Sequence, residues 1–340
     1  MTYLRETDGL KYKAEEMKKI LVTGSAGFIG SHLCEHLLEQ GFHVTGIDNF
    51  DPFYGKKYKI YNHNVNLGHD RYTFFEVDLK NIDLLAPAFS DVGVVIHLAG
   101  KAGVRPSIED PQSYIDNNIS VTQNILEVMK ETGIKKMLFA SSSSVYGNNP
   151  NTPWTETLDV NNPISPYAFT KKACELLNHT YHHLYDIDIL NLRFFTVFGP
   201  RQRPDLAIHK FIKMMFRGDT IPMFGDGTTS RDYTYVKDTV AGITGALEYI
   251  IENDKVFDTV NLGHNHPVKL IDLINAIGEA TGRTPVIDRK PMQPGDVNIT
   301  YAEISKAKKM FGYDPKTPLG EGLKAFVEWF RENPQFLEMD

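Results

Sequence analysis

A run of three glycines directly after an apolar segment constrains this chain most strongly. Residues 20–23 (Ile-Leu-Val-Thr) have the composition of a buried strand, and Gly24, Gly27 and Gly30 follow at a spacing of three. Glycine allows a tight turn and a close approach of one backbone segment to another. A helix predicted over 28–40 begins within the run, and its start presents N–H groups and the positive dipole end to an anion. This segment is therefore expected to bind a phosphate.

Strands and helices alternate over much of the chain. Strands are predicted over 43–47, 72–77, 92–97, 136–140 and 188–195, and helices over 111–132, 166–185, 238–251 and 269–281. Several of the strands are continuous apolar runs, which is typical of strands buried on both faces of a parallel sheet. The alternation predicts an α/β fold with a doubly wound, Rossmann-like parallel sheet.

The length of 340 residues suggests about two domains. Beyond residue 198 the pattern loosens and glycine and proline cluster. The predicted parts are a polar, flexible or helical extension over 1–16, a dinucleotide-binding domain over 17–197, a smaller and mainly substrate-binding domain over 198–340, and a stretch over 233–262 that packs back on the first domain.

Composition excludes several classes of protein. Asp and Glu outnumber Lys and Arg by 43 to 36, which argues against a nucleic-acid partner. The two cysteines, Cys34 and Cys174, have no neighbours at metal-ligand spacing, so neither a disulfide scaffold nor a metal site is expected. No apolar run is long enough to span a membrane, and the polar N-terminus lacks the features of a signal peptide. A cytoplasmic location is expected by default.

An acidic residue stands where a dinucleotide site needs one. Asp48 lies 18 residues after Gly30, at the end of the second predicted strand. A carboxylate there binds the hydroxyls of the adenosine ribose. It would repel a 2′-phosphate, and no arginine follows directly, so NAD is predicted rather than NADP. Asp78 ends the third strand and is either an adenine contact or a helix cap.

A tyrosine–lysine pair carries the candidate chemistry. Tyr167 and Lys171 are four residues apart, so they share one face of the predicted helix over 166–185. An ammonium beside a phenol favours the phenolate and lowers the phenol pKa from its usual value of about 10, which suits a general base. Four serines, residues 141–144, end the fifth strand, where α/β sheets hold their ligands. Ser142 is the candidate to bond the same substrate oxygen as Tyr167.

Together these features resemble the extended short-chain dehydrogenases/reductases, specifically the NAD-dependent nucleotide-sugar epimerase/dehydratase family, over about residues 18–330. The motifs that carry the resemblance are Thr23-Gly24-x-x-Gly27-Phe28-Ile29-Gly30, His97-Leu98-Ala99-Gly100, Ser142 with Val145-Tyr146-Gly147, Tyr167-x-x-x-Lys171 and Arg231-Asp232-Tyr233. The resemblance implies a tightly held NAD and a nucleoside-diphosphate sugar.

The resemblance also implies roles for individual residues. Tyr167 would remove the proton of the sugar C4 hydroxyl while a hydride leaves C4, and Lys171 would bind the nicotinamide ribose. The residues implied for the cofactor are Gly24, Gly27, Phe28, Ile29, Gly30, Asp48, Asn49, Asp78, Leu79, Leu98, Ala99, Gly100, Lys101, Asn118, Tyr167 and Lys171. Those implied for the substrate are Ser142, Ser143, Thr196, Arg203, Arg231 and Asp296.

The residues after Ser142 bear on the type of reaction. In the family that this chain resembles, members that eliminate water have an Asp-Glu pair at these positions, and decarboxylases have a glutamate. This chain has Ser143 and Ser144 there. Simple C4 epimerisation is therefore expected: a transient 4-keto sugar rotates and accepts the hydride on its other face. Such a site grips the nucleotide firmly and the sugar loosely.

Three segments resemble the UDP-glucuronate 4-epimerases: residues 48–54, 195–196 and 199–205. A hexuronate carries a C6 carboxylate, which a planar guanidinium binds with two hydrogen bonds. Arg203 is the candidate for this contact, with Thr196 and Ser143 as lesser ones; alternatively Arg203 is a surface residue or a phosphate contact. Arg105 is a second candidate that would otherwise serve the cofactor phosphates.

Two departures from the family pattern leave alternatives open. Gln293 stands where many relatives have arginine, and Gly100-Lys101 replaces a commoner Ala-Gln near the nicotinamide. The rival substrates are UDP-glucose and UDP-N-acetylglucosamine, and the other rivals are a UDP-glucuronate decarboxylase and a non-catalytic NAD-binding protein. The resemblance further implies a role in polysaccharide biosynthesis and a homodimer formed through the helices predicted over 111–132 and 166–185.

Overall fold

The computed structural model describes residues 19–291 and 297–339, so the predicted extension over 1–16 and residues Gln293 and Asp296 lie outside the described residues. The described chain divides into two compact units. Unit 1 comprises 19–141, 166–192 and 243–259, and unit 2 comprises 142–165, 193–242, 260–291 and 297–339.

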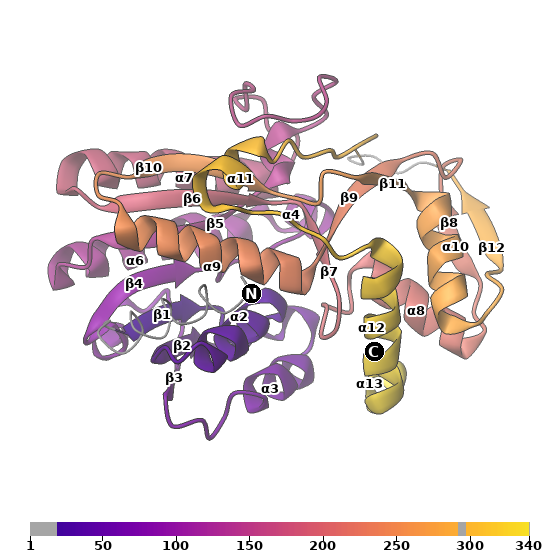
Figure 1. The fold of residues 1–340 in the computed structure, drawn as a ribbon, viewed down its shortest axis with the longest axis horizontal. Helices are drawn as coiled ribbons and strands as arrows, with labels where there is room; N and C mark the ends of the chain where they lie inside the picture. The colour runs from indigo at the N-terminus through magenta and orange to yellow at the C-terminus, as the bar shows by residue number, and fades with distance from the viewer. Residues whose placement is uncertain (1–18, 292–296, 340) are drawn as a thin grey trace, which may run out of the picture. The chain divides into compact units, whose positions relative to one another are not determined.

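A seven-stranded sheet organises unit 1 (Figure 1). Its strands, in spatial order, are β10 (Phe257–Leu262), β6 (Asp188–Phe194), β5 (Lys136–Ser142), β4 (Val92–His97), β1 (Lys19–Thr23), β2 (Val44–Asp48) and β3 (Tyr72–Glu76). The pairs β1·β2, β2·β3, β1·β4 and β4·β5 are parallel, which confirms the doubly wound sheet. The strand order reverses between β1 and β4, and ligands of such sheets bind at the carboxyl ends beside this reversal.

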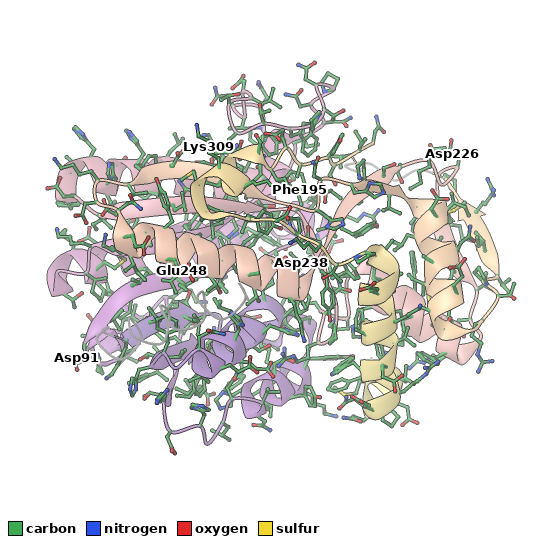
Figure 2. The ribbon with its side chains drawn as sticks, viewed as in Figure 1. Asp91, Phe195, Asp226, Asp238, Glu248 and Lys309 are labelled. Atoms are coloured by element: carbon green, nitrogen blue, oxygen red, sulfur yellow. The ribbon has the colours of Figure 1, made fainter. Side chains whose placement is uncertain are left out.

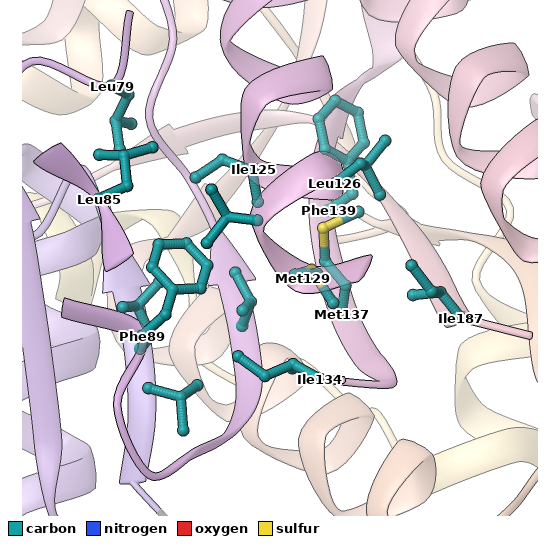
Figure 3. Close-up of a cluster of buried hydrophobic side chains, with 14 of the residues drawn as sticks. Leu79, Leu85, Phe89, Ile125, Leu126, Met129, Ile134, Met137, Phe139 and Ile187 are labelled. Atoms are coloured by element: carbon teal, nitrogen blue, oxygen red, sulfur yellow. The ribbon is translucent and has the colours of Figure 1, made fainter. Parts of the chain in front are cut away.

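The hydrophobic core of unit 1 lies between this sheet and two helices (Figure 3). Helices α6 (Val121–Thr132) and α7 (Pro166–Tyr185) bury Ile125, Leu126 and Cys174 with Val95 and Phe139 of the sheet. The central strands are buried on both faces: every residue of β2 is buried, as are four of the five residues of β1, whereas the edge strand β3 is only partly buried. This burial explains why the apolar runs in the sequence predicted the strands well.

The helix predicted over 111–132 is divided. A short α5 (Pro111–Tyr114) is followed by a π-helical turn, η4 (Ile115–Ser120), and then by α6. A π-turn inside a helix often marks a functional site, because it re-aims side chains that a regular helix would place elsewhere. Asn118, one of the predicted cofactor residues, lies in this turn.

The remaining elements of unit 1 are helices and short turns on the connections between strands. They are α2 (Phe28–Glu39), η1 (Pro52–Tyr54), α3 (Lys56–Asn64), η2 (Ile82–Leu84), η3 (Ala86–Phe89) and α4 (Val104–Glu109). The predicted helix over 28–40 is confirmed as α2, whereas α3 and α4 were not predicted. Helix α9 (Val236–Glu252) belongs to unit 2 up to residue 242 and to unit 1 from residue 243.

Unit 2 contains two small sheets and a group of helices (Figure 1). The strands are β7 (Thr196–Phe198), β8 (Ile221–Phe224), β9 (Ser230–Tyr235), β11 (Pro267–Lys269) and β12 (Ile287–Lys290). The helical elements are η5 (Ser143–Tyr146), α8 (Ala207–Arg217), α10 (Leu270–Thr281), α11 (Ser305–Phe311), α12 (Leu319–Glu332) and α13 (Gln335–Glu338). Helix α10 packs on both α8 and α12, and Phe326 and Phe330 of α12 lie against His209 of α8.

The strand predicted over 188–195 ends one residue early. Phe195 donates its backbone N–H to the Leu262 carbonyl at 3.0 Å, and the chain then enters β7 in a different sheet. Residues 142–165 also group with unit 2, although they fall inside the range predicted for the first domain. The functional assignment of the two domains stays a prediction.

Within the described residues, none of the helices combines the length and the apolar character that crossing a bilayer requires.

Candidate active site

The turn after β1 leaves no room for a side chain at Gly30 and needs the left-handed backbone of Gly24. Gly24 has a φ of 70°, and a Cβ atom at Gly30 would lie 2.1 Å from the Gly24 carbonyl oxygen. Gly27 donates its N–H to the same oxygen at 2.9 Å and then begins α2, and glycine has no side chain with which to cap the helix. The first turn of α2 therefore keeps N–H groups for an anion.

The carboxylate of Asp48 is fixed at the end of β2. Its Oδ2 accepts the Ala26 N–H at 3.2 Å, and its Oδ1 accepts the Phe50 N–H at 2.9 Å. Lys59 of α3, which is buried like Asp48, donates from Nζ to Oδ1 at 3.3 Å. The tight glycine cradle beside a fixed carboxylate fits the pyrophosphate and the adenosine ribose of NAD.

The segments that follow β2 and β3 are joined. Asn49 donates from Nδ2 to Asp78 Oδ2 at 3.2 Å, and Asp78 Oδ1 accepts the Lys80 N–H at 2.9 Å. The Asp78 side chain therefore closes the turn after β3, but it does not cap the helical turn η2 that follows, whose N-cap residue is Asn81. Its contact with adenine stays a prediction. Leu79 beside it is buried.

A buried chain of hydrogen bonds links β1, β4 and α6. Ala99 donates its N–H to Thr23 Oγ1 at 3.2 Å, and this hydroxyl lies 2.7 Å from His97 Nδ1. His97 Nε2 lies 3.2 Å from Thr122 Oγ1, which donates to the Asn118 carbonyl at 2.7 Å. Because the Thr122 proton is used there, the network assigns the ring proton to Nε2. Burial, followed by the nearby Lys171, lowers the pKa of His97 to about 3, so the ring is neutral.

Asn118 ties the segment after β4 to α7. Its Oδ1 accepts the Lys101 N–H at 2.8 Å, and its Nδ2 donates to the Lys101 carbonyl at 3.0 Å and to Thr170 Oγ1 at 2.9 Å. The ammonium of Lys101 donates to Ser113 Oγ and lies 5.7 Å from the centre of the Phe53 ring. The Lys101 side chain is thus held toward α5, while neighbouring Leu98 and Ala99 are half-buried and Gly100 is exposed.

Tyr167 and Lys171 occupy the first turns of α7. The Tyr167 backbone N–H donates to Ser107 Oγ at 3.1 Å, and its half-buried ring lies edge-on to Tyr114 with 6.1 Å between centres. Lys171 is buried and donates from Nζ to the Ala140 carbonyl of β5 at 2.7 Å. Burial lowers the pKa of Lys171, and the neighbouring Cys174 and Glu175 act in the opposite direction.

The four serines form the end of β5 and the turn η5. Ser142 is buried, and its Oγ accepts the backbone N–H of Ser144 at 3.2 Å and the Ser144 hydroxyl at 2.9 Å. Ser143 and Ser144 are half-buried. The Ser142 hydroxyl therefore still has its own proton to donate, as the predicted contact with a substrate oxygen requires.

Tyr146 anchors the turn η5 within unit 2. Its hydroxyl donates to Asn261 Oδ1 at 2.7 Å and accepts from Arg193 Nη1 at 3.0 Å. Its ring lies 5.1 Å from that of Trp154 and 6.3 Å from that of Phe195, which is labelled in Figure 2. Burial raises the pKa of Tyr146 to about 12, so this tyrosine stays protonated and has a structural role.

Arg203 already has a carboxylate partner. Its Nε and Nη2 donate to the two carboxylate oxygens of Asp205 at 3.0 and 2.6 Å. The Arg203 side chain is 14% exposed and that of Asp205 is 34% exposed. The geometry of this pair is the two-pronged geometry by which a guanidinium binds any carboxylate.

Two other predicted substrate residues, Thr196 and Arg231, lie on the paired strands β7 and β9. Thr196 begins β7 and Arg231 lies in β9, both half-buried, with Arg231 Nη1 donating to the Ser230 carbonyl at 2.9 Å. Arg105 is exposed on α4. Phe28 is buried and Ile29 half-buried at the start of α2.

Two charged residues of the site were missed by the sequence reasoning. Lys59 lies in a helix that was not predicted, so its contact with Asp48 had no signal. Glu175 did have a signal in the sequence, namely its spacing. It follows Lys171 by four residues, as Lys171 follows Tyr167, so all three share a helix face. Its carboxylate is buried and accepts the Ser141 hydroxyl at 2.6 Å.

The fold and these residues define a class of protein, namely dinucleotide-dependent enzymes with a doubly wound sheet and a tyrosine–lysine pair. Residues 21–326 match the family model described as GDP-mannose 4,6 dehydratase. The chain therefore belongs to this family of extended short-chain dehydrogenases/reductases, as the motifs predicted.

Individual relatives narrow the comparison. The chain is 41% identical over 322 residues to a UDP-glucuronate 4-epimerase of Thermodesulfobacterium geofontis, covering 94% of this chain and 98% of the relative. A crystal structure of UDP-glucuronic acid 4-epimerase from Bacillus cereus, in complex with UDP-glucuronic acid and NAD, aligns with a TM-score of 0.87 at 39% identity, covering 93% of this chain and 99% of that one. A UDP-N-acetylglucosamine 4-epimerase from Methanobrevibacter ruminantium aligns with a TM-score of 0.85 at 34% identity, over 93% and 99% of the two chains.

Proposed function

We propose that this protein is an NAD-dependent 4-epimerase that interconverts UDP-glucuronate and UDP-galacturonate. The observation that carries the proposal is the buried ammonium of Lys171, held on the carboxyl end of β5 one helical turn after Tyr167. The choice of sugar rests on the similarity to UDP-glucuronate 4-epimerases.

The roles of the chain's own residues follow from their chemistry. Tyr167 removes the proton of the C4 hydroxyl, and the charge of Lys171 stabilises the phenolate that accepts it. Ser142 donates a hydrogen bond to the same oxygen. The glycine turn and Asp48 hold the pyrophosphate and the adenosine ribose. NAD, when bound, accepts the hydride from C4 and returns it.

The absence of a carboxylate in η5 supports epimerisation over elimination. Ser143 and Ser144 have hydroxyls that ionise too weakly to remove a proton from carbon or to drive loss of water. The turn η5 therefore supplies no acid or base for a second reaction of the 4-keto sugar. The reaction that is left is rotation of the sugar followed by return of the hydride.

For the sugar carboxylate we propose that Arg203 exchanges Asp205 for the C6 carboxylate of the substrate. The exchange replaces one two-pronged ion pair with another, so it costs little beyond moving a partly exposed Asp205. Thr196 and Ser143 are proposed as secondary contacts. Arg231 and Asp296 are proposed to bind the nucleotide.

We also propose a homodimer and a cytoplasmic location. Helix α7 exposes Phe169, Leu176 and Leu184, which are spaced by seven and eight residues and so follow one face of the helix. An exposed apolar stripe of this kind suits a helix–helix interface between two copies. A role in polysaccharide biosynthesis agrees with a uronic-acid product and stays a prediction.

The test is incubation of the purified protein with UDP-glucuronate, without added NAD, and identification of the product sugar by proton NMR. Formation of UDP-galacturonate supports the reaction, the acidic substrate and the retention of cofactor together. An unchanged sugar, even with NAD added, contradicts the choice of substrate. The second candidate, favoured by the Methanobrevibacter ruminantium structure, is UDP-N-acetylglucosamine, and UDP-glucose follows as a third.

A further inference from the structure

The carboxyl end of β5 is held by two side chains from α7. Lys171 Nζ donates to the carbonyl of Ala140 at 2.7 Å, and Glu175 Oε1 accepts the hydroxyl of Ser141 at 2.6 Å. The two partners on β5 are consecutive residues, and the two side chains on α7 are one turn apart. The next residue of the chain is Ser142. This double attachment therefore fixes the backbone directly before the residue that carries the predicted catalytic hydroxyl.

Glu175 is a buried carboxylate on the same face of α7 as Tyr167 and Lys171. It is 4% exposed, and Lys171 is 5% exposed. A buried charge is expensive unless an opposite charge or hydrogen bonds compensate for it. The carboxylate has the Ser141 hydroxyl, and Lys172 Nζ lies 3.5 Å from its Oε2. These two contacts stabilise the negative charge of Glu175 next to the buried ammonium of Lys171.

We propose that Glu175 is a positioning residue of the epimerase site, which keeps Lys171 in its ammonium form and, through Ser141, fixes the end of β5. This inference rests on the proposed function, in which the Lys171 charge stabilises the Tyr167 phenolate. Glu175 touches neither substrate nor cofactor in this account and acts only through Lys171 and Ser141.

The other charged and titratable groups around Lys171 do not replace Glu175. His97 of β4 is neutral, because burial lowers its pKa to about 3. Burial raises the pKa of the Cys174 thiol, so it carries no charge at neutral pH. On α7, Lys172 is a further cation, and Tyr167 is the group that Lys171 serves. The Lys101 ammonium is held toward Ser113 of α5.

The sign of the effect follows from the charges. Burial lowers the pKa of Lys171, whereas Cys174, when its thiol is ionised, and Glu175 raise it. Removal of the carboxylate charge therefore leaves Lys171 easier to deprotonate. Activity that needs the ammonium is then lost at a lower pH than in the parent protein.

The test is the pH profile of kcat for UDP-glucuronate in the holoenzyme. Glu175→Gln keeps the size of the side chain and an oxygen that accepts the Ser141 hydroxyl, and removes only the charge. We expect the alkaline limb to move down by about one pH unit. Glu131→Gln, an exposed site at the end of α6, is the matched control and should keep the parent profile.

Two further variants separate charge from position and do not depend on the folding of Glu175→Gln. Ser141→Ala keeps the carboxylate, and should lower kcat while leaving the alkaline limb in place. Lys172→Gln removes the opposing cation at a side chain that is 20% exposed, and should move the limb slightly up. An alkaline limb that coincides with the parent's in Glu175→Gln, or that moves down in Lys172→Gln, overturns the proposal.

Failure of this inference is distinguishable from failure of the proposed function. Tyr167→Phe tests the function itself. If Tyr167→Phe abolishes turnover while Glu175→Gln keeps the parent profile, the epimerase mechanism stands and the role of Glu175 falls. If Tyr167→Phe turns over UDP-glucuronate like the parent, the proposed mechanism falls first.

Discussion

The residues assigned to the cofactor and those assigned to the sugar are held in different ways. In unit 1, Asp48, Asn118 and Lys171 are buried and bonded to backbone atoms or to other buried side chains. In unit 2, Arg203, which is assigned to the sugar carboxylate, is half-buried, and its two-pronged partner Asp205 is 34% exposed and only two residues away. The cofactor half is thus preorganised, whereas the sugar half has contacts that a substrate can exchange. This difference suits an enzyme that retains NAD and lets the 4-keto sugar rotate in its site.

The largest effect is expected at the base. Tyr167→Phe removes the group that accepts the C4 proton and should lower kcat by about 10²–10⁴-fold. The fold should be unaffected, because the contact made by the Tyr167 main chain with Ser107 is kept. Steady-state kinetics with UDP-glucuronate measure it, with circular dichroism as the folding control. Parent-like kcat in a folded variant would remove Tyr167 from the mechanism.

Next in size is the loss of the buried ion pair in the preorganised half. Lys59→Met leaves the Asp48 carboxylate buried without its cation, which should cost about 3 kcal/mol in the free energy of unfolding. The protein should also be purified with less bound NAD. Lys57→Met, an exposed neighbour in α3, is the matched control. Urea unfolding and the NAD content measure both effects, and equal values for the two variants would show that the pair does not organise the site.

A smaller and more selective effect is expected in the exchangeable half. Arg203→Ala should lower kcat/KM for UDP-glucuronate by about 10–100-fold, because a charge-assisted pair with the substrate is lost. UDP-glucose and UDP-N-acetylglucosamine have no C6 carboxylate, so any turnover of them should change little. Asp205→Asn, which loosens the internal pair, should leave the preference for glucuronate intact. Equal losses on all three sugars would instead assign Arg203 to the nucleotide.

The effect that is smallest near neutral pH concerns stability, is shared by both units and grows as the pH falls. Burial lowers the pKa of His209 to about 4 and that of His97 to about 3, whereas both titrate near 6.5 when unfolded. Stability should therefore be full above pH 6.5 and fall below it, by about 1 kcal/mol per pH unit for each histidine down to about pH 4. Urea unfolding at several pH values measures the slope. His209→Gln should reduce the slope, whereas His43→Gln at an exposed site should not.

The central strands of unit 1 could be predicted because they are buried on both faces. Val92–His97 and Lys136–Ser142 have continuous apolar stretches that few other structures require. The short strands of unit 2 could not, since β11 and β12 are three and four residues long and partly exposed. Helix α3 was missed because its sequence, KKYKIYNHN, is mostly polar and lacks an apolar period.

The site was predictable where its chemistry depends on spacing along the chain. The glycine turn, Asp48 and the Tyr167–Lys171 pair each have a fixed spacing that follows from a strand, a turn or a helix. Contacts between distant segments have no such signal: the attachment of Lys59 to Asp48 and of Glu175 to Ser141 depends on how helices pack on the sheet. The partner of Arg203 lies only two residues away, yet nothing in the sequence distinguished this pairing from a free surface arginine.

The transient 4-keto sugar is the centre of this account, and epimerisation in deuterium oxide tests it most directly. The hydride that leaves C4 returns to the same carbon without meeting solvent, so UDP-galacturonate formed in deuterium oxide should carry hydrogen at C4, and this is read by proton NMR and mass spectrometry. Deuterium at C4 of the product would contradict hydride transfer and retention, and with it the proposed mechanism.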